Sequence, residues 1–479
     1  MLGFLKRRRS WGSLDQPLLN WSERDCLTVR GLLNGGVAVL GASGSGKTSS
    51  SGKQLARSIL AQGNNGGLIL CAKPDDALFW QRLFAEAERM KDLIVFSPDG
   101  PWRFDFLDYE MRQGGHTRNI TRLIMTIGET LRSSDHSASE NSDFWEREQE
   151  RMLYNAVQII KVATGKVTAP DLQRFIGGAA NGAEEISSES WQTGFHHQCI
   201  RAAYLADKSA VDTHDCQLAF DYWLSELPRM ASKTKSSIEV GVNGILHVFN
   251  TGITRSLVSG GTNVSPDDMF DRKWVMVNMA PAAWGDIGSF INAGWKYLTQ
   301  KAILRRDATE GDSINVIWCD EAQQFVNSFD SQYLAQCRSH LGCMVFLTQS
   351  LSSLYSVLKG PAGRHQADAL MANFGHTIIH ACDPISAEWA SSKLGKTLQT
   401  FIGGSMAPTT DLWDDLKGHS QYTGSFSEHY ESVVQPNVFM NGLRTGGHVN
   451  GLMCDAILLR NGQPFSNGQN WLNVSFSQM

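Results

Sequence analysis

The sequence lacks the features of a membrane-spanning or secreted protein. No apolar run approaches the roughly 20 residues that a helix needs to cross a bilayer, and no apolar segment of a secretory signal follows the basic run Lys6–Arg9. The nine cysteines contain no C-x-x-C pair, which favours reduced thiols over a disulfide framework. We therefore expect a cytoplasmic protein, whose basic run is either a solvated tail or an arm that touches nucleic acid or anionic lipid.

An excess of positive charge is also lacking. Lys and Arg number 43 against 48 Asp and Glu, and the formal net charge is −5. A dedicated sequence-specific DNA-binding protein is usually basic, but a ring whose basic residues line only a pore is compatible with this balance. The chain has 479 residues, 42% of them hydrophobic and 19% charged, which is an ordinary globular composition with enough length for two or more folding units.

One glycine-rich stretch matches the pattern G-x-x-x-x-G-K-[ST] of a phosphate-binding loop: Gly41, Ala42, Ser43, Gly44, Ser45, Gly46, Lys47 and Thr48. Glycines let the backbone curl so that its N–H groups point at phosphate oxygens, and the following helix adds its positive end. Lys47 is predicted to reach the β- and γ-phosphates and Thr48 to hold Mg²⁺, with Ser49 next to them in the cofactor-binding set. The alternative is a flexible Gly/Ser surface loop.

The surroundings of this stretch favour the phosphate-binding interpretation. Val37–Leu40 before it has the pattern of a short buried strand, and Ser49–Ala61 after it has helical spacing. A strand, a loop and a helix in this order are the setting that the motif requires.

An acidic pair follows the apolar run Ile314–Cys319. Asp320 and Glu321 come at the carboxyl end of this predicted strand, where ligands gather in an open α/β sheet. Asp320 is expected to hold Mg²⁺ through water, and Glu321 to act as the general base on the attacking water. The alternative is a solvated strand end, but a phosphate-binding loop in the same chain favours the catalytic role.

Two more residues are candidates for contact with the γ-phosphate. Gln349 follows the predicted strand Met344–Leu347 and can touch this group; alternatively, the segment is a helix N-cap region with Ser350 as the cap. Arg338 precedes the same strand. In ring ATPases an arginine at this place reaches the γ-phosphate of the neighbouring subunit and stabilises transition-state charge, whereas the alternative is a surface salt bridge.

The spacing of apolar runs predicts an α/β fold. Runs separated by helix-length segments indicate βαβ units and a parallel sheet. The predicted strands are Val37–Leu40, Leu68–Cys71, Leu93–Phe96, Trp274–Val277, Ile314–Cys319, Met344–Leu347, Thr377–His380 and Cys454–Leu459. Residues 112–235 lack such runs and are predicted to be a mostly helical insertion. At its end, Ser232–Ser236 is either a solvated linker or a place of sequence-independent phosphate contact.

Together these residues resemble the TraG/TraD-like coupling ATPases of type IV secretion and conjugation, within the wider FtsK/HerA group of RecA-like P-loop motors. The resemblance covers residues 25–400 and more loosely the tail. It is carried by the loop at 41–48, the Lys73–Asp75 segment after a strand, Val95–Pro98, the Phe144–Trp145 helix, the strand that ends at Asp320 and Glu321, Arg338 eleven residues before Gln349, and Asn373–Gly375.

The resemblance implies a RecA-like P-loop fold with a mostly parallel central sheet and an inserted all-α domain. It implies a homo-oligomer, a hexamer, that uses ATP and Mg²⁺ to move DNA or present substrates through a central channel, with secretion-system or relaxosome-type proteins as partners. The corresponding division of the chain is 1–24 N-terminal arm, 25–111 motor domain with the P-loop, 112–235 helical insertion, 236–400 motor domain with the acidic pair, and 401–479 a loop-rich part returning to the motor domain.

The sequence departs from that family at two places. Family members usually have an aspartate where Cys71 or Ala72 stands, which leaves the role of Lys73 open. Most members also carry N-terminal membrane helices, and this sequence shows none. We therefore expect a soluble form, with membrane contact only through a partner.

Two other functions remain open at this point. One is a nucleotide-gated docking platform that recruits protein substrates to a secretion machine or another assembly. The other is a HerA-like defence or repair motor that works with a nuclease. No guanine-reading motif of the Asn/Thr-Lys-x-Asp type is evident, so ATP is the expected nucleotide.

Overall fold

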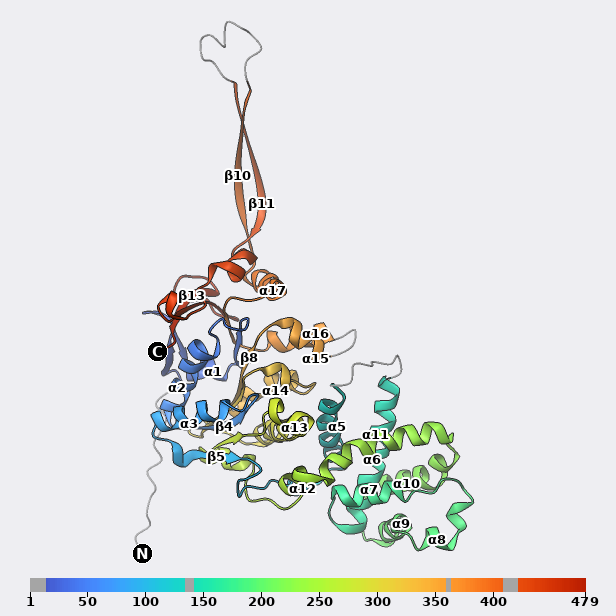
Figure 1. Ribbon diagram of the computed structural model, residues 1–479. Coiled ribbons are helices and arrows are strands. Elements are labelled where there is room, and N and C mark those ends of the chain that lie inside the picture. Colours follow the sequence, from blue (N-terminus) through green and yellow to red (C-terminus); the bar gives the residue numbers. More distant parts are fainter. Residues whose placement is uncertain (1–13, 134–141, 359–362, 408–420) are drawn as a thin grey trace, which may run out of the picture. The chain divides into compact units, whose positions relative to one another are not determined.

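The computed structural model describes residues 14–133, 142–358, 363–407 and 421–479 (Figure 1). The chain divides into two compact units. The first consists of Met1–Ala38, Lys53–Thr348 and Ser353–Gly375, and the second of Val39–Gly52, Gln349–Ser352 and His376–Met479. The basic run Lys6–Arg9 lies outside the described residues.

The first unit contains a parallel sheet of buried strands. Five strands pair in the order β8 (Gly342–Thr348), β7 (Ile314–Cys319), β4 (Asn65–Leu70), β6 (Trp274–Val277) and β5 (Leu93–Phe96). Every residue of β4, β6, β7 and β8 is buried, as expected for parallel strands that are covered on both faces. The predicted α/β class with a parallel sheet is confirmed, and β5, β6 and β7 have the predicted ends.

Helices make up most of the rest of this unit. Their bounds are α1 (Val29–Leu33), α2 (Lys53–Gln62), α3 (Asp76–Glu86), α4 (Phe106–Arg112), α5 (Thr117–Ser133), α6 (Ser142–Thr164), α7 (Ala169–Gly177), α8 (Glu189–Gln192), α9 (Phe195–Leu205), α10 (Ala210–Asp221), α11 (Ser232–Asn250), α12 (Gly252–Val258), α13 (Pro281–Arg305), α14 (Asp330–Gln336), α15 (Leu351–Val357, begun in the second unit) and α16 (Gly363–Ala372). None of the helices in the described ranges combines the length and apolar character that crossing a bilayer requires.

Between β5 and β6 the described residues form helices and turns but no strand. Within this segment, helix α5 packs against α13, and α6 packs against α5, α9, α10 and α11 (Figure 1). The segment therefore has the helical character expected of the insertion, while its boundaries at 112 and 235 stay a prediction.

The linker predicted at Ser232–Ser236 is wrong, because these residues open helix α11. The Lys235 side chain is 5% exposed, donates to the Ala180 carbonyl at 2.7 Å and lies 3.7 Å from a Glu239 carboxylate oxygen. A buried, paired ammonium is not available to a phosphate backbone. The sequence pattern of lysines among small hydroxyl residues did not reveal this, since burial here depends on the neighbouring helix.

The N-terminal arm predicted for residues 1–24 needs correction where it is described. Strand β1 (Pro17–Asn20) pairs antiparallel with β2 (Cys26–Thr28), and Leu18 and Trp21 are buried. Residues 14–24 are thus folded against the first unit rather than extending from it.

The second unit is built on antiparallel strands. Strand β12 (Met453–Arg460) pairs with both β9 (His376–Ile379) and β13 (Trp471–Ser477). Strand β3 (Gly36–Leu40) ends in this unit, where the Leu40 carbonyl accepts from the His380 N–H at 2.8 Å. Helix α17 (Pro384–Leu394) follows β9.

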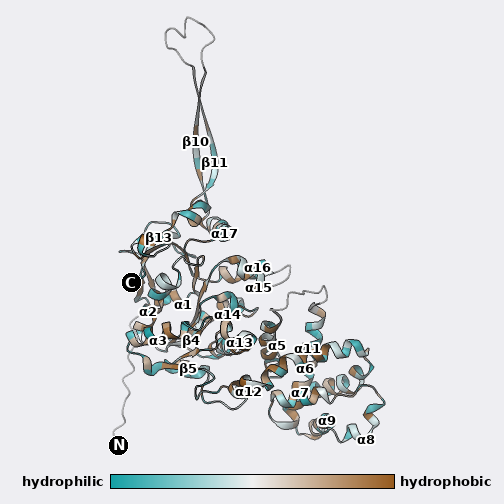
Figure 2. Ribbon diagram, viewed as in Figure 1, coloured by the Kyte–Doolittle hydropathy of each residue, from teal (hydrophilic) through white to brown (hydrophobic). Residues whose placement is uncertain are grey.

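A long hairpin replaces part of the loop-rich segment that was predicted after residue 400. Strands β10 (Lys396–Ala407) and β11 (Gln421–Ser432) pair along all 12 residues of each strand. Hydrophobic and hydrophilic residues are mixed along both strands (Figure 2). The prediction failed because Gly, Ser and Thr between the apolar residues resemble a loop, whereas the pairing of β10 with β11 supplies the backbone hydrogen bonds.

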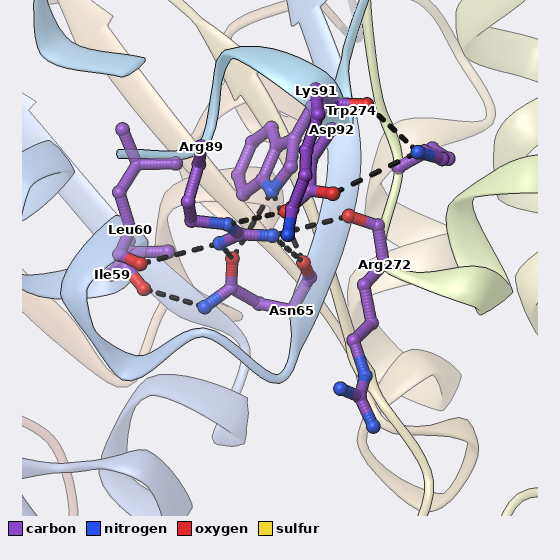
Figure 3. Close-up of polar contacts among 9 residues, drawn as sticks. Ile59, Leu60, Asn65, Arg89, Lys91, Asp92, Arg272 and Trp274 are labelled. Carbon is purple, nitrogen blue, oxygen red and sulfur yellow. Dashed lines mark hydrogen bonds and ion pairs between the residues drawn. The ribbon is translucent and has the colours of Figure 1, made fainter. Parts of the chain in front are cut away.

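The amino ends of β4 and β6 are held by one buried arginine (Figure 3). The Arg89 guanidinium donates to the Leu60 carbonyl at 3.2 Å, to Asn65 Oδ1 at 2.6 Å and to the Arg272 carbonyl at 3.1 Å. Its Nε donates to Asp92 Oδ2 at 2.9 Å. The side chain is 7% exposed, so a single cation satisfies acceptors from α2, β4 and the turn before β6.

Replacing this arginine is expected to destabilise the fold. Arg89→Met leaves buried carbonyl and carboxylate oxygens without their donor, so the free energy of unfolding should fall by about 3–5 kcal/mol. Urea unfolding followed by circular dichroism measures the change. Arg82→Met, at an exposed position of α3, is the matched control and should cost less than about 0.5 kcal/mol. Equal effects of the two variants would contradict the assignment.

Candidate active site

The predicted phosphate-binding loop lies in the second unit, directly after β3. Gly44 and Gly46 both have left-handed backbones, with φ of +79° and +86°. A Cβ placed on Gly46 would fall 2.2 Å from the Sγ of Cys454. Position 46 therefore requires glycine for both its conformation and its space.

The loop presents several donors that no acceptor in the described residues uses. Across the described residues, the backbone N–H groups of Gly44, Gly46 and Lys47 have no acceptor, and the buried Ser45 hydroxyl has no hydrogen-bond partner. Lys47 is only 6% exposed, and none of the ion pairs in the described residues involves it. Because a buried ammonium without a counter-ion is costly, this cradle fits an anion such as a phosphate chain.

The loop continues into a π-helical turn instead of the α-helix predicted from Ser49. This turn, η1 (Thr48–Gly52), precedes α2. The Ser50 hydroxyl donates to the Gly46 carbonyl at 2.7 Å, and the Ser49 hydroxyl accepts from Gln478 Nε2 at 2.8 Å. Side chains from the C-terminal part of the unit thus help to hold the loop.

His380, which the sequence analysis did not single out, is hydrogen-bonded to the turn that follows the loop. His380 Nε2 lies 2.8 Å from the Ser51 hydroxyl, and Nδ1 lies 3.0 Å from the Asp455 carbonyl. With Nδ1–H donated to that carbonyl, Nε2 is the acceptor for Ser51. Burial lowers the pKa of His380 to about 4, and the positive charge of Lys47 adds to the effect, so the imidazole is neutral near pH 7. Only its place at the end of a predicted strand marked His380 in the sequence.

The acidic pair lies in the first unit, after β7. Asp320 is half-buried, and its Oδ1 accepts the N–H of Glu321 at 2.8 Å. Glu321 has a left-handed backbone with φ of +50°, and its side chain is 4% exposed. Its two oxygens accept from Lys73 Nζ at 2.6 Å and from Gln323 Nε2 at 2.8 Å. The carboxylate is therefore held in one orientation.

A buried ion pair fixes the chain that follows this carboxylate. Lys296 on α13 and Asp330 at the start of α14 have fully buried side chains, with Nζ and Oδ2 2.6 Å apart. Asp330 also accepts from Gln300 Nε2 at 2.7 Å and from the Asn327 N–H at 3.0 Å. This cluster, which the sequence pattern did not reveal, fixes the segment between Glu321 and α14.

The two remaining candidates have different surroundings. Gln349 is half-buried in the second unit, before α15, whose Leu351 N–H donates to the Ser386 hydroxyl at 3.0 Å. Arg338 is exposed on η8 (Cys337–His340) of the first unit, 3.4 Å from Asn34 Oδ1, and lines a pocket of about 660 Å³. No carboxylate in the described parts of the chain lies within ion-pair distance of Arg338. The roles of both residues stay predictions.

A parallel α/β sheet with an amide-lined, lysine-bearing loop defines the class of P-loop nucleotide-binding folds. Solved structures with this architecture include the bacterial conjugative coupling protein TrwBdeltaN70 in its unbound monoclinic form, with 13% identity and a TM-score of 0.59, covering 96% of this chain and 89% of that one. Plasmid coupling protein TrwB in complex with the ATP analogue ADPNP has 14% identity and a TM-score of 0.59, covering 98% of this chain and 91% of that one. TrwB in complex with ADP and Mg²⁺ gives 13% identity, a TM-score of 0.59 and coverage of 98% and 91%.

These similarities extend over nearly the whole chain and show its fold. The predicted RecA-like P-loop fold is confirmed. No protein-family model matches the sequence, and no curated protein matches it either.

Acid should weaken the fold partly through His380. As the pH falls from about 6.5, the usual histidine pKa, towards 4, the unfolded chain binds a proton that folded His380 does not, so stability is lost. His380→Gln should reduce the slope of unfolding free energy against pH in this window by about 1.4 kcal/mol per pH unit. Urea titrations at several pH values measure the slope. Identical slopes for the unmodified protein and His380→Gln would refute the assignment.

Proposed function

We propose that this chain is a cytoplasmic, ATP-hydrolysing ring motor that couples DNA to a transfer or secretion machine. The observation that carries the ATPase part is Lys47, a buried ammonium without a carboxylate partner in the described residues. It lies in a loop where the N–H groups of Gly44, Gly46 and Lys47 have no acceptor in the described chain. The fold of a coupling protein that was solved with ADPNP and with ADP and Mg²⁺ supports the same proposal.

In the proposed mechanism, the amides of Gly44 and Gly46 and the Lys47 ammonium bind the β- and γ-phosphates of ATP. Thr48 and Asp320 would hold Mg²⁺, which supplies positive charge to the phosphate oxygens when bound. The oxygen ligands that these side chains offer suit this ion. Glu321 is the general base that takes a proton from the attacking water.

Two residues complete the proposed site. Gln349 touches the γ-phosphate and reports its loss. Arg338 acts across the ring on the nucleotide of the neighbouring subunit; its exposure and lack of an ion pair in the described residues support this role. The hexamer, the contact with DNA and the secretion-system partners rest on the resemblance to coupling ATPases.

Removing the Lys47 ammonium should abolish turnover while the fold stays intact. Lys47→Ala takes away the charge that binds the phosphates, so ATP hydrolysis should fall by at least about 100-fold. A coupled phosphate-release assay measures it, and circular dichroism checks the fold. Lys53→Ala, on the first residue of α2, is the control and should retain activity. Normal ATP hydrolysis by Lys47→Ala would contradict the assignment of this loop as the nucleotide-binding site.

DNA should stimulate hydrolysis if the chain is a translocating motor. The stimulated rate and the affinity for double- and single-stranded DNA should fall steeply with salt, with a log–log slope of about −0.9 for each duplex phosphate contact. Hydrolysis and fluorescence anisotropy at low and moderate salt measure both quantities. Hydrolysis that does not respond to DNA at either salt concentration would contradict the motor.

A docking platform is the second candidate, and the hairpin favours it. One face of β10 and β11 carries the cross-strand pairs Leu398–Tyr430 and Ile402–Phe426, whose four side chains are 50–87% exposed. Exposed apolar patches of this kind mark interaction surfaces. DNA-independent hydrolysis would favour this function, and Ile402→Ser should then weaken partner binding without changing the rate of hydrolysis.

A further inference from the structure

Lys73 is the charged residue of the first unit whose role the sequence left open. It follows β4, which pairs in parallel with β7 so that Leu70 lies opposite Cys319. Because parallel strands point the same way, the chain leaves both strands at the same edge of the sheet. Lys73 and Glu321 therefore emerge side by side, with Nζ and Oε1 2.6 Å apart, although they are 248 residues apart in the sequence.

The backbone of Lys73 is fixed. One carboxylate oxygen of Asp76, the first residue of α3, accepts from the N–H groups of both Ala72 and Lys73 at 2.8 Å. The Lys73 side chain is 56% exposed, whereas its carboxylate partner is 4% exposed. The ammonium thus approaches the buried Glu321 from the solvent side. The backbone that carries it is held by the two hydrogen bonds to Asp76.

Lys73 and Gln323 together clamp the carboxylate of Glu321. Glu321 Oε2 accepts from Gln323 Nε2 at 2.8 Å, and Gln323 Oε1 in turn accepts from the Thr348 hydroxyl at 3.0 Å. One oxygen is thus held by Lys73 after β4, and the other by Gln323, whose own amide is held by Thr348 at the end of β8.

The charges around the pair also favour a cation at this place. Asp76 and Asp320 both lie close enough to Lys73 to raise its pKa, after the larger contribution of the hydrogen bond to Glu321. Burial raises the pKa of Asp76. Three carboxylates without an ammonium among them would repel one another and an incoming polyphosphate.

We propose that Lys73 is a positioning residue for the general base: its ammonium holds the Glu321 carboxylate in the orientation needed to receive a proton from water. This inference rests on the proposed ATPase function. Lys73 acts through Glu321 in the chemical step and takes no part in binding the nucleotide. Loss of the ammonium should therefore lower kcat and leave KM for ATP nearly unchanged.

The test uses the full chain with its activating DNA. Lys73→Met removes the charge and keeps the apolar stem, and should lower kcat by about 10- to 100-fold with KM changed less than about 2-fold. Lys73→Arg keeps a cation at this place and should recover most of the rate. Lys91→Met, which removes an exposed lysine of the same unit, is the matched control and should behave as the unmodified chain.

A double-mutant cycle separates this role from a structural one. In a Glu321→Gln background, which has no carboxylate to position, Lys73→Met should cause no further fall in kcat. This background also removes the buried charge that Lys73→Met would otherwise leave without its cation, so the comparison survives if the single variant folds poorly. Unfolding midpoints of all variants are measured alongside.

Three outcomes would overturn the proposal: unchanged kcat in Lys73→Met, a rise in KM as the main effect, or an equal fall in kcat in both backgrounds. The first denies any role in catalysis, the second indicates contact with the nucleotide, and the third shows action independent of Glu321. The failure of the proposed function looks different. In that case the unmodified chain does not hydrolyse ATP, or Lys47→Ala hydrolyses it normally.

Discussion

Parallel pairing of β4 with β7 is the constraint on which the acidic half of the candidate site depends. The register that sets Leu70 opposite Cys319 brings Lys73 to Glu321 and leaves Asp320 at the same edge of the sheet. The other end of β4 is held by Arg89 through acceptors on α2, β4 and the turn before β6. A slip of one residue would turn each buried side chain to the opposite face, so the packed sheet keeps the geometry of the candidate site.

Three lysines differ in burial and in ion pairing, and these differences decide what each charge can interact with. Lys296 is fully buried with Asp330, so its charge is satisfied inside the protein and serves the fold. Lys47 is buried without such a partner in the described chain, so its charge is available to a phosphate. Lys73 is half in solvent and paired with a buried carboxylate, so its charge acts on Glu321. The cost of a desolvated charge decides each case.

Local patterns predicted much of the fold and part of the site. β5, β6 and β7 were found to the residue because short apolar runs bounded by polar residues are unambiguous when the strands are buried. The sequence singled out the loop at residues 41–48 because the phosphate-binding pattern needs glycines at set positions, and Gly44 and Gly46 do have left-handed backbones. The hairpin β10–β11 was missed because its Gly, Ser and Thr residues resemble a loop, and Lys235 was misjudged because a neighbouring helix buries it.

The sequence by itself determined the loop at residues 41–48, the acidic pair after β7 and the apolar runs of the sheet, because each depends on a few adjacent residues. Only the tertiary structure decided that β4 lies beside β7 while β5 and β6 come between them in the sequence. It likewise decided that Lys73 meets Glu321, that Lys296 meets Asp330 and that His380 supports the loop. Strand order and side-chain burial arise from packing over the whole chain, and no local pattern encodes them.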